Sequence, residues 1–245
     1  MIDLHAHLLP GLDDGPPDLA SALEMAAGMV EAGIEVVAAT PHLRPALGWL
    51  NHRDVVTAAL ESFTEALQRA GTPLRVVPGA EHFFDEELIA QIEDGRATPL
   101  NLGRYILVEL STVALPPRLP ERLFEIRRRG LEPLLAHVER YAALFEQPAL
   151  LEELVEQGYT LQVDVGALAG AYGGAQRRNA WKAVERVPAT LVASDAHNIG
   201  DVRELVVKVA RKLRRRLGAE RTEELLRHNP AAVLAGRPID AAPRI

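Results

Sequence analysis

The chain has 245 residues and contains no cysteine. This absence excludes disulfide bonds, zinc sites built on thiolates and every mechanism that needs a cysteine nucleophile. Any metal binding or catalysis must therefore use nitrogen and oxygen atoms from other side chains.

Long apolar runs are also absent. No stretch approaches the roughly 20 apolar residues needed to cross a bilayer, and the chain starts directly with a short apolar run, without a basic and apolar leader. We therefore expect a cytoplasmic protein without membrane insertion. Aromatic residues make up only 4% of the chain, but 48% of it is hydrophobic, which is ordinary for a soluble protein. This length predicts one domain over residues 1–245.

Positive charge is in deficit, because the net charge is −7 at pH 7. Binding to duplex nucleic acid depends on phosphate contacts and favours basic surfaces, so we expect no nucleic-acid partner. The basic segment from Lys208 to Arg216 is a local exception. It predicts the solvated face of a long helix.

Seven short runs rich in Val, Ile and Leu recur along the chain, and they are typical of parallel strands buried on both faces. They lie near residues 2–6, 34–40, 74–79, 105–110, 132–137, 159–165 and 189–195. Helical patterns separate several of them, and these patterns end in glycines that tolerate a left-handed C-cap. The clearest helical patterns cover residues 19–33, 54–71, 119–130 and 148–158.

Two short pairs of polar residues stand at the ends of the first and last runs. They are His5 with His7, and Asp195 with His197. Alternate side chains of an extended strand share a face, so each pair points two metal-ligand types in one direction. The pairs therefore predict a metal site.

Four further candidate ligands follow other apolar runs: His42, Glu81, Glu109 and His137. A lone histidine is more often structural or exposed than a ligand. Their shared position at strand ends favours metal binding instead. Asp14, in the sequence GLDDG, is a candidate ligand or a turn residue.

This distribution bears on the choice between two α/β folds. In a parallel α/β barrel the C-terminal ends of all strands meet at one rim, where widely separated residues can share a site. A doubly wound open sheet has the same alternation of elements, but only strands near its crevice could share one. We therefore predict the barrel and keep the open sheet as the alternative.

Six motifs cover nearly the whole chain: MIDLHAHLLPGLDDG, VVAATPH, VVPGAE, YILVEL, LLAHVERY and ASDAHN. Together they resemble the polymerase-and-histidinol-phosphatase (PHP) superfamily of metal-dependent phosphoesterases. More narrowly, they resemble its branch of manganese-dependent bacterial tyrosine phosphatases of capsular and exopolysaccharide synthesis. The resemblance implies a distorted seven-stranded (β/α)7 barrel of the PHP type. It also implies hydrolysis of phosphotyrosine on the tail of a bacterial tyrosine autokinase.

The resemblance further implies three divalent metal ions and assigns their ligands. His5, His7, Glu109 and Asp195 would hold the first ion, and Glu109 would bridge to the second. Glu81 and His137 would complete the second site, and the third site would use Asp14, His42 and His197. Manganese is the implied metal, although iron, magnesium or zinc also suits oxygen and imidazole ligands.

In this interpretation a hydroxide shared between metals attacks phosphorus directly, without a phospho-enzyme. A phenolate leaving group, with a pKa of about 10, needs little help from a general acid. Phosphate oxygens need further positive charge, which planar guanidinium groups supply. Arg140 is the first candidate for this contact and Arg203 the second. Branch members often carry proline where this chain has Val138.

Several nearby residues have supporting interpretations. Asp13 is predicted to hold a ligand or form the turn, and Asp164 to orient a ligand or bond to a loop backbone. Tyr141 is predicted to pack. Trp49, in the loop 44–53, either stacks on a phosphotyrosine ring or packs under that loop. Three histidines receive no role: His52, His82 and His228.

Other functions remain open at this point. A small-molecule phosphatase, such as a histidinol phosphatase, would have the same metal centre, since substrate choice depends on loops. An amidohydrolase also uses His-x-His on a barrel, but glutamates at two middle strand ends fit it poorly. The complete ligand set disfavours a metal-binding scaffold without catalysis. The net negative charge disfavours a nuclease.

Overall fold

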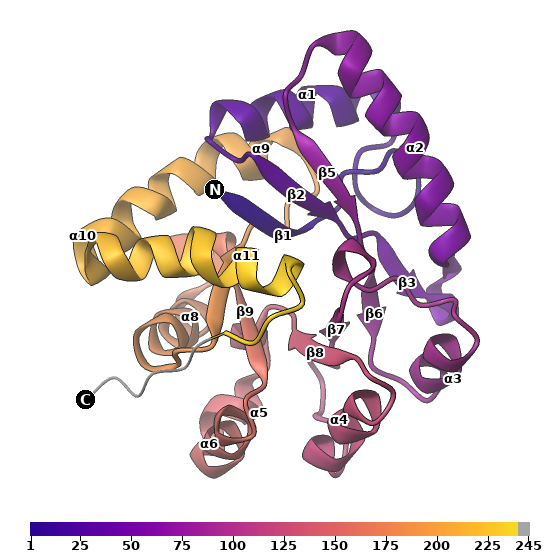
Figure 1. The fold of residues 1–245 in the computed structure, drawn as a ribbon. Coiled ribbons are helices and arrows are strands. Elements are labelled where there is room, and N and C mark those ends of the chain that lie inside the picture. The colour runs from indigo at the N-terminus through magenta and orange to yellow at the C-terminus, as the bar shows by residue number, and fades with distance from the viewer. Residues whose placement is uncertain (240–245) are drawn as a thin grey trace.

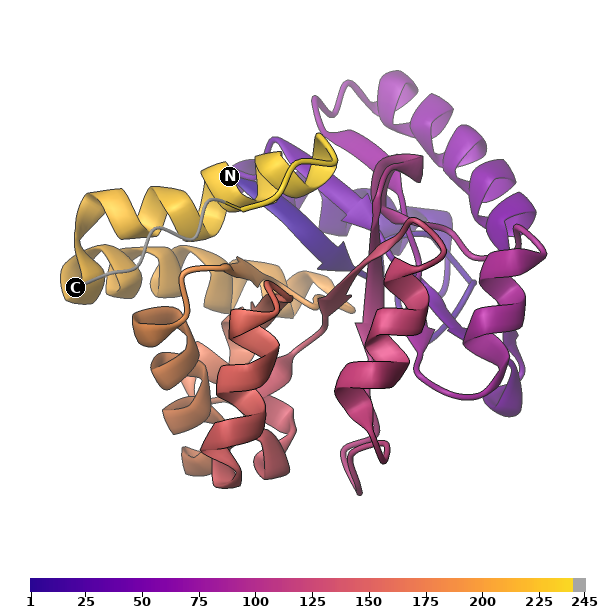
Figure 2. The same ribbon diagram turned by 60° about the horizontal axis from the view of Figure 1, so that its bottom comes forward.

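The structure is a computed structural model that describes residues 1–239. Helices lie outside a group of mostly parallel strands in both views of the ribbon (Figure 1, Figure 2). The strands are β1 (Ile2–Ala6), β2 (Val36–Ala39), β3 (His42–Arg44), β4 (Trp49–Leu50), β5 (Arg75–Pro78), β6 (Glu81–Phe83), β7 (Tyr105–Glu109), β8 (Glu132–Leu135), β9 (Thr160–Asp164) and β10 (Thr190–Ala193).

The helices connect these strands and form the outer layer. They are α1 (Leu19–Glu31), α2 (Arg53–Ala70), α3 (Glu87–Glu93), α4 (Leu119–Arg127), α5 (Ala142–Glu146), α6 (Pro148–Glu156), α7 (Val165–Ala169), α8 (Gly174–Arg186), α9 (Ile199–Asp201), α10 (Val207–Glu223) and α11 (Asn229–Leu234). Short turns of 3₁₀ or π geometry fill several gaps, among them a turn over Val138–Arg140. None of the helices within residues 1–239 combines the length and apolar character that a membrane crossing requires.

The strands form two sheets. Three strands pair in the order β1-β2-β5, and seven pair in the order β10-β9-β8-β7-β6-β3-β4. Every pair is parallel except the short β3–β4 hairpin. Pro78, which has no N–H to donate, stands in β5 at the edge of the smaller sheet.

Backbone hydrogen bonds join the two sheets next to their C-terminal ends. Asp195 N donates to His5 O at 2.8 Å, and His7 N donates to Ala196 O at 2.9 Å, so β1 lies beside the segment that follows β10. Only two residues separate β2 from β3, and two separate β5 from β6, so these pairs of strands continue one another. The ends of β1, β2 and β5 therefore lie close to the larger sheet, to which β10 belongs.

One apolar cluster is shared by both sheets. Each of six strands contributes a buried residue to it: Leu4, Ala38, Val77, Leu107, Leu134 and Leu191. Val233 of α11 joins the same cluster, and Figure 1 shows α11 beside β1 although the two lie at opposite ends of the sequence. A second, larger cluster includes residues of the strands and of the surrounding helices.

The predicted elements are present. Each of the seven apolar runs contains a strand, and each of the four helical patterns contains a helix, so the α/β class is confirmed. Closure into a single seven-stranded barrel stays a prediction, because the strands form two separate ladders. The short strands β3, β4 and β6 were not predicted. Two or three residues each are too few to give a periodic pattern.

Strand β9 departs from the predicted apolar pattern. Leu161 and Val163 belong to the larger apolar cluster, whereas Thr160, Gln162 and Asp164 alternate with them and are equally buried. Buried polar side chains require hydrogen-bond partners. Gln162 finds its partners among the candidate ligands, and Asp164 finds its own in Gln162 and Arg140.

Candidate metal centre

His5 and His7 bring two ring nitrogens together. Their Nε2 atoms lie 3.3 Å apart. The Nδ1 atom of His5 faces Gln162 Oε1 at 3.2 Å, and that of His7 faces Asp13 Oδ2 at 2.6 Å. An amide oxygen and a carboxylate oxygen only accept, so in a neutral ring each Nδ1 carries the hydrogen. Both Nε2 atoms then present lone pairs to the same small space.

Two buried carboxylates face the same space. Glu81 Oε2 lies 3.3 Å from the Nε2 atom of His5 and 3.5 Å from that of His7. Asp195 Oδ1 lies 3.2 and 3.3 Å from the same two nitrogens. Both oxygens are buried without a hydrogen-bond donor among the described residues. Four such atoms can lie this close only with positive charge between them, from a proton on a ring or from a metal ion, so the geometry fits a divalent cation.

A second group forms around Glu81. His42 Nδ1 lies 2.9 Å from Glu81 Oε2, and His137 Nε2 lies 2.7 Å from Glu81 Oε1. Glu109 Oε1 lies 4.0 Å from the same nitrogen of His137. Burial and the nearby Glu81 charge raise the pKa of Glu109. Crowding of two carboxylates again favours a bound cation.

A third group lies on the solvent side. Asp14 Oδ1 is 3.5 Å from His42 Nε2 and 3.3 Å from His197 Nε2. His197 Nδ1 donates to the Asp195 carbonyl at 2.9 Å, which leaves its Nε2 lone pair directed to Asp14. The Asp14 side chain is 51% exposed, whereas that of His5 is fully buried. The cluster therefore opens to solvent at Asp14.

All nine predicted ligands thus lie in one continuous cluster, but their grouping differs from the implied one. Glu81, not Glu109, stands with His5, His7 and Asp195. Glu109 instead groups with His42 and Glu81. Glu81 is therefore the carboxylate placed to bridge two groups.

The backbone is strained at two of these positions. His137 has φ 30° and ψ 54°, and Asp195 has φ 50°. Left-handed conformations are unfavourable for residues with a side chain, and they concentrate at functional sites. Here they follow β8 and β10, where each strand ends. The strain turns both side chains toward the cluster.

Arg140 lies against the cluster. Its Nη2 donates to Asp164 Oδ2 at 2.7 Å and also to Asp195 Oδ2. The other oxygen of Asp195 faces the histidines. The Arg140 side chain is 29% exposed, so the guanidinium is anchored on one side and accessible on the other. That arrangement suits binding of an anion beside the cluster.

Gln162 is a supporting residue that the sequence did not reveal. Its Oε1 accepts from the His137 backbone N–H at 2.6 Å as well as from His5. Its Nε2 donates to Asp164 Oδ1 at 2.7 Å, and Asp164 in turn holds Arg140. One amide therefore orients two candidate ligands and the arginine. The available signal was a glutamine between Leu161 and Val163 in the predicted run 159–165.

The other supporting interpretations have definite outcomes. Asp13 forms the turn and also holds ligands, because its carboxylate accepts from Gly15 N, His7 Nδ1 and His42 N. Asp164 pairs with side chains that contact the ligands. Tyr141 is buried, but its hydroxyl also lies 3.1 Å from His137 Nδ1 and accepts from Leu110 N.

Three peripheral residues lie as follows. The Trp49 ring stacks on the candidate ligand His42, with ring centroids 4.6 Å apart and an interplanar angle of 9°. Arg203 is 53% exposed and pairs with Glu24 and Glu31 of α1, so its contacts do not support a role in binding phosphate. His82 is structural: it is buried between Leu107 O and Thr98 N, and burial lowers its pKa to about 4.

Cation binding should release protons. Burial lowers the pKa of His5, but the Glu81 and Asp195 carboxylates outweigh this effect and raise it to about 9. Below that pH a proton occupies the metal-free ring, and an incoming cation must displace it. We therefore expect the apparent affinity for Mn²⁺ to increase with pH up to about 9. Calorimetry in buffers of different ionisation enthalpy measures this release, and a pH-independent affinity would contradict it.

Replacing Gln162 with leucine tests the supporting network. The variant keeps the volume but loses the hydrogen bonds to His5, His137 and Asp164. We expect the affinity for Mn²⁺ to fall by about 10–100-fold, the usual effect of losing a group that orients ligands. The exposed Gln157→Leu serves as the control, and thermal unfolding checks that both variants fold. Equal metal affinity in the two variants would refute this role.

Comparisons with known proteins show which family this chain resembles. A family model for capsular polysaccharide synthesis, CpsB/CapC, matches residues 1–235. The tyrosine-protein phosphatase YwqE of Bacillus subtilis is 35% identical over 199 residues, which cover 81% of this chain and 78% of YwqE. The tyrosine-protein phosphatase CpsB of Streptococcus pneumoniae is 25% identical over 239 residues, covering 96% of this chain and 98% of CpsB.

Solved structures give the same result. One crystal structure has a TM-score of 0.90 to this chain. It comes from a study of YwqE from Bacillus subtilis and CpsB from Streptococcus pneumoniae, described there as unique metal-dependent tyrosine phosphatases. That structure and this chain share 32% sequence identity, and the match covers 99% of this chain and 98% of the other. The family resemblance predicted from the motifs is therefore confirmed, and the chain belongs to the CpsB/CapC family of capsular polysaccharide synthesis.

Proposed function

We propose that this protein is a metal-dependent protein-tyrosine phosphatase. The observation that carries the proposal is the convergence of lone pairs from His5, His7, Glu81 and Asp195, beside the Arg140 guanidinium. Metal ions held by these groups, together with the guanidinium, would suit transfer of a phosphoryl group, because its charge must be neutralised while water attacks. The names of the relatives YwqE and CpsB support phosphotyrosine as the substrate over a small phosphate ester such as histidinol phosphate.

We further propose that the site holds three divalent ions, with manganese as the first choice. The proposed ligands are His5, His7, Asp14, His42, Glu81, Glu109, His137, Asp195 and His197. Such ions, when bound, acidify water and polarise the phosphoryl group. Asp13 and Gln162 would keep His7 and His5 in the tautomer that leaves Nε2 free.

Phosphate would be bound by Arg140. Asp164 and Asp195 fix its guanidinium at the edge of the cluster, and the exposed part remains free to donate to phosphate oxygens. The substrate would enter from the side of Asp14, because the opposite wall at His5 is buried. Trp49, stacked on His42, would then lie near the phenyl ring. A phenolate leaving group, with a pKa of about 10, makes a strong general acid unnecessary.

We propose a phosphotyrosine-bearing protein tail as the substrate, and a bacterial tyrosine autokinase of polysaccharide synthesis as the partner that carries it. Support comes from the family, whose model is named for capsular polysaccharide synthesis. The reaction would take place in the cytoplasm. No membrane insertion or nucleic-acid binding is part of the proposal, and the net charge of −7 disfavours the latter.

The first experiment compares three substrates with metal-stripped protein to which Mn²⁺ is returned. We expect hydrolysis of a phosphotyrosine peptide that depends on the metal and exceeds that of a phosphoserine peptide and of histidinol phosphate. Faster hydrolysis of histidinol phosphate would keep the metal centre and overturn the substrate. Absence of hydrolysis with every divalent metal would overturn the enzymatic function itself.

The role of Arg140 is tested by Arg140→Lys. Lysine keeps the charge but loses the planar pair of donors, so both the anchor on Asp164 and Asp195 and the contact to phosphate weaken. We expect kcat/KM for the phosphotyrosine peptide to fall on the order of 10²-fold. Arg203→Lys is the matched control and should retain the activity. Equal activities of the two variants would show that Arg140 does not bind phosphate.

A further inference from the structure

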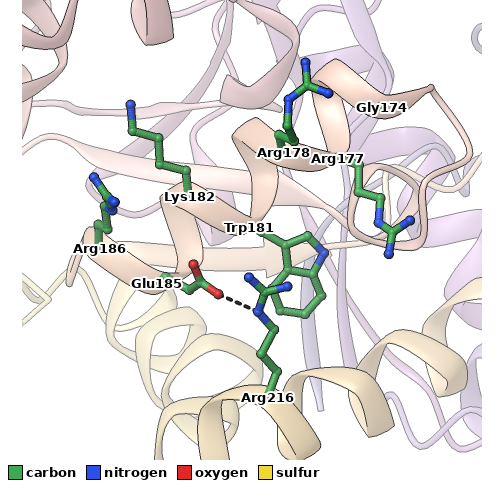
Figure 3. Close-up of a pocket in the computed structure, with 8 residues that line it drawn as sticks. All are labelled: Gly174, Arg177, Arg178, Trp181, Lys182, Glu185, Arg186 and Arg216. Atoms are coloured by element: carbon green, nitrogen blue, oxygen red, sulfur yellow. Dashed lines mark hydrogen bonds and ion pairs between the residues drawn. The ribbon is translucent and has the colours of Figure 1, made fainter.

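A basic groove lies between α8 and α10, outside the metal centre. It has a volume of about 550 Å³ and is lined by Arg177, Arg178, Trp181, Lys182 and Arg186 of α8 and by Arg216 of α10. Figure 3 shows the Arg216 guanidinium over the Trp181 ring, with the cations of α8 around it. The guanidinium carbon lies 4.4 Å from the ring centroid. The α8/α10 groove thus has cationic walls around a buried tryptophan that Arg216 covers.

The positive charge of this groove is largely uncompensated. Glu185 pairs with Arg216, but Arg177, Arg178 and Arg186 make no ion pair with any carboxylate within residues 1–239. Arg178, Lys182 and Arg186 recur every four residues on one helix face, a spacing at which like charges destabilise a helix.

The cations of the two helices also act on each other. Burial lowers the pKa of Lys212 of α10, and so does repulsion by Arg177 of α8 and by cationic neighbours on its own helix. A bound anion would relieve this repulsion.

The groove is connected to the metal centre through α8. Asn179 of α8 donates to the Glu139 carbonyl at 3.3 Å, in the turn that carries Arg140. Tyr172, two residues before α8 begins, places its ring 5.1 Å from the Arg140 guanidinium carbon. A polypeptide that leaves Arg140 past Tyr172 would run toward the N-terminal end of α8, the helix that carries Arg177 and Arg178.

We propose that the α8/α10 groove binds an acidic segment of the substrate protein, next to the phosphotyrosine that occupies the metal centre. This inference rests on the proposed phosphatase function. A single extended segment fits this groove because it can enter a concave site. Salt screens distant charges, so the segment interacts mainly with the cations beside it. A membrane surface or a nucleic-acid duplex fits less well, because the net charge of −7 repels large anionic surfaces.

The test uses full-length protein loaded with Mn²⁺ and phosphotyrosine peptides that differ only beside the phosphotyrosine. One peptide carries a run of aspartates on the N-terminal side of the phosphotyrosine, and a second carries it on the C-terminal side. A third peptide carries serines in place of the aspartates. We expect one acidic peptide to have a kcat/KM about tenfold above the serine peptide, the size expected from a few exposed charge pairs. The gain should lie in KM and should decrease with salt.

The matched variants are Arg178→Gln/Lys182→Gln/Arg186→Gln and, on other faces, Arg69→Gln/Arg75→Gln/Arg128→Gln. Both remove the same charge. The groove variant should lose the preference, keep its activity on the serine peptide and unfold at the same or a higher temperature. The control variant should keep the preference. Equal kcat/KM for all peptides in the unmodified protein, or equal losses in both variants, would overturn the proposal.

Direct binding separates this proposal from the phosphatase function. Fluorescence anisotropy with an unphosphorylated aspartate peptide should show binding that the groove variant loses. The same binding, together with no hydrolysis of the phosphotyrosine peptide that carries serines, would refute the phosphatase function and retain an anion-binding groove. Binding to vesicles of anionic lipid that depends on the same three residues, without a peptide preference, would identify a membrane surface instead and refute the acidic segment.

Discussion

Repulsion among buried lone pairs is the constraint on which the site depends. His5, His7, Glu81 and Asp195 turn acceptor atoms toward one another at 3.2–3.5 Å, and the two carboxylate oxygens lack a donor. In a buried space such an arrangement is stable only with positive charge at its centre. A proton can supply that charge, as the raised pKa of His5 indicates, but a divalent cation satisfies all four groups at once.

The fold provides what this arrangement requires. Parallel strands end side by side, and the hydrogen bonds between β1 and the segment after β10 bring the N-terminal His-x-His pair to the C-terminal Asp-x-His pair. Left-handed backbone at His137 and Asp195 then turns their side chains inward. Behind the ligands, Asp13, Gln162 and Asp164 use hydrogen bonds to fix tautomers and the Arg140 guanidinium. Stability is given up locally so that ligands are held in place.

The sequence was sufficient for the longer strands and for naming candidate ligands, because both have local signals. Apolar runs marked seven strands, polar residues after these runs marked eight candidate ligands, and Asp14 in the GLDDG turn was the ninth. The sequence did not reveal which carboxylate groups with His5, His7 and Asp195. That choice between Glu81 and Glu109 depends on how β6 lies against β7, which is a tertiary property. Gln162 was missed because a single polar residue in a strand does not indicate its partners. Arg203 follows a ligand pair in sequence, but in the structure its guanidinium pairs with Glu24 and Glu31 of α1.

The central claim is that the cluster of lone pairs holds metal. Anomalous diffraction from crystals grown with Mn²⁺, recorded on both sides of the manganese absorption edge, tests it most directly. We expect the strongest anomalous peak among His5 Nε2, His7 Nε2, Glu81 Oε2 and Asp195 Oδ1, with further peaks beside Glu109 and beside Asp14. A crystal that contains Mn²⁺ elsewhere but shows no peak among those four atoms would contradict the account.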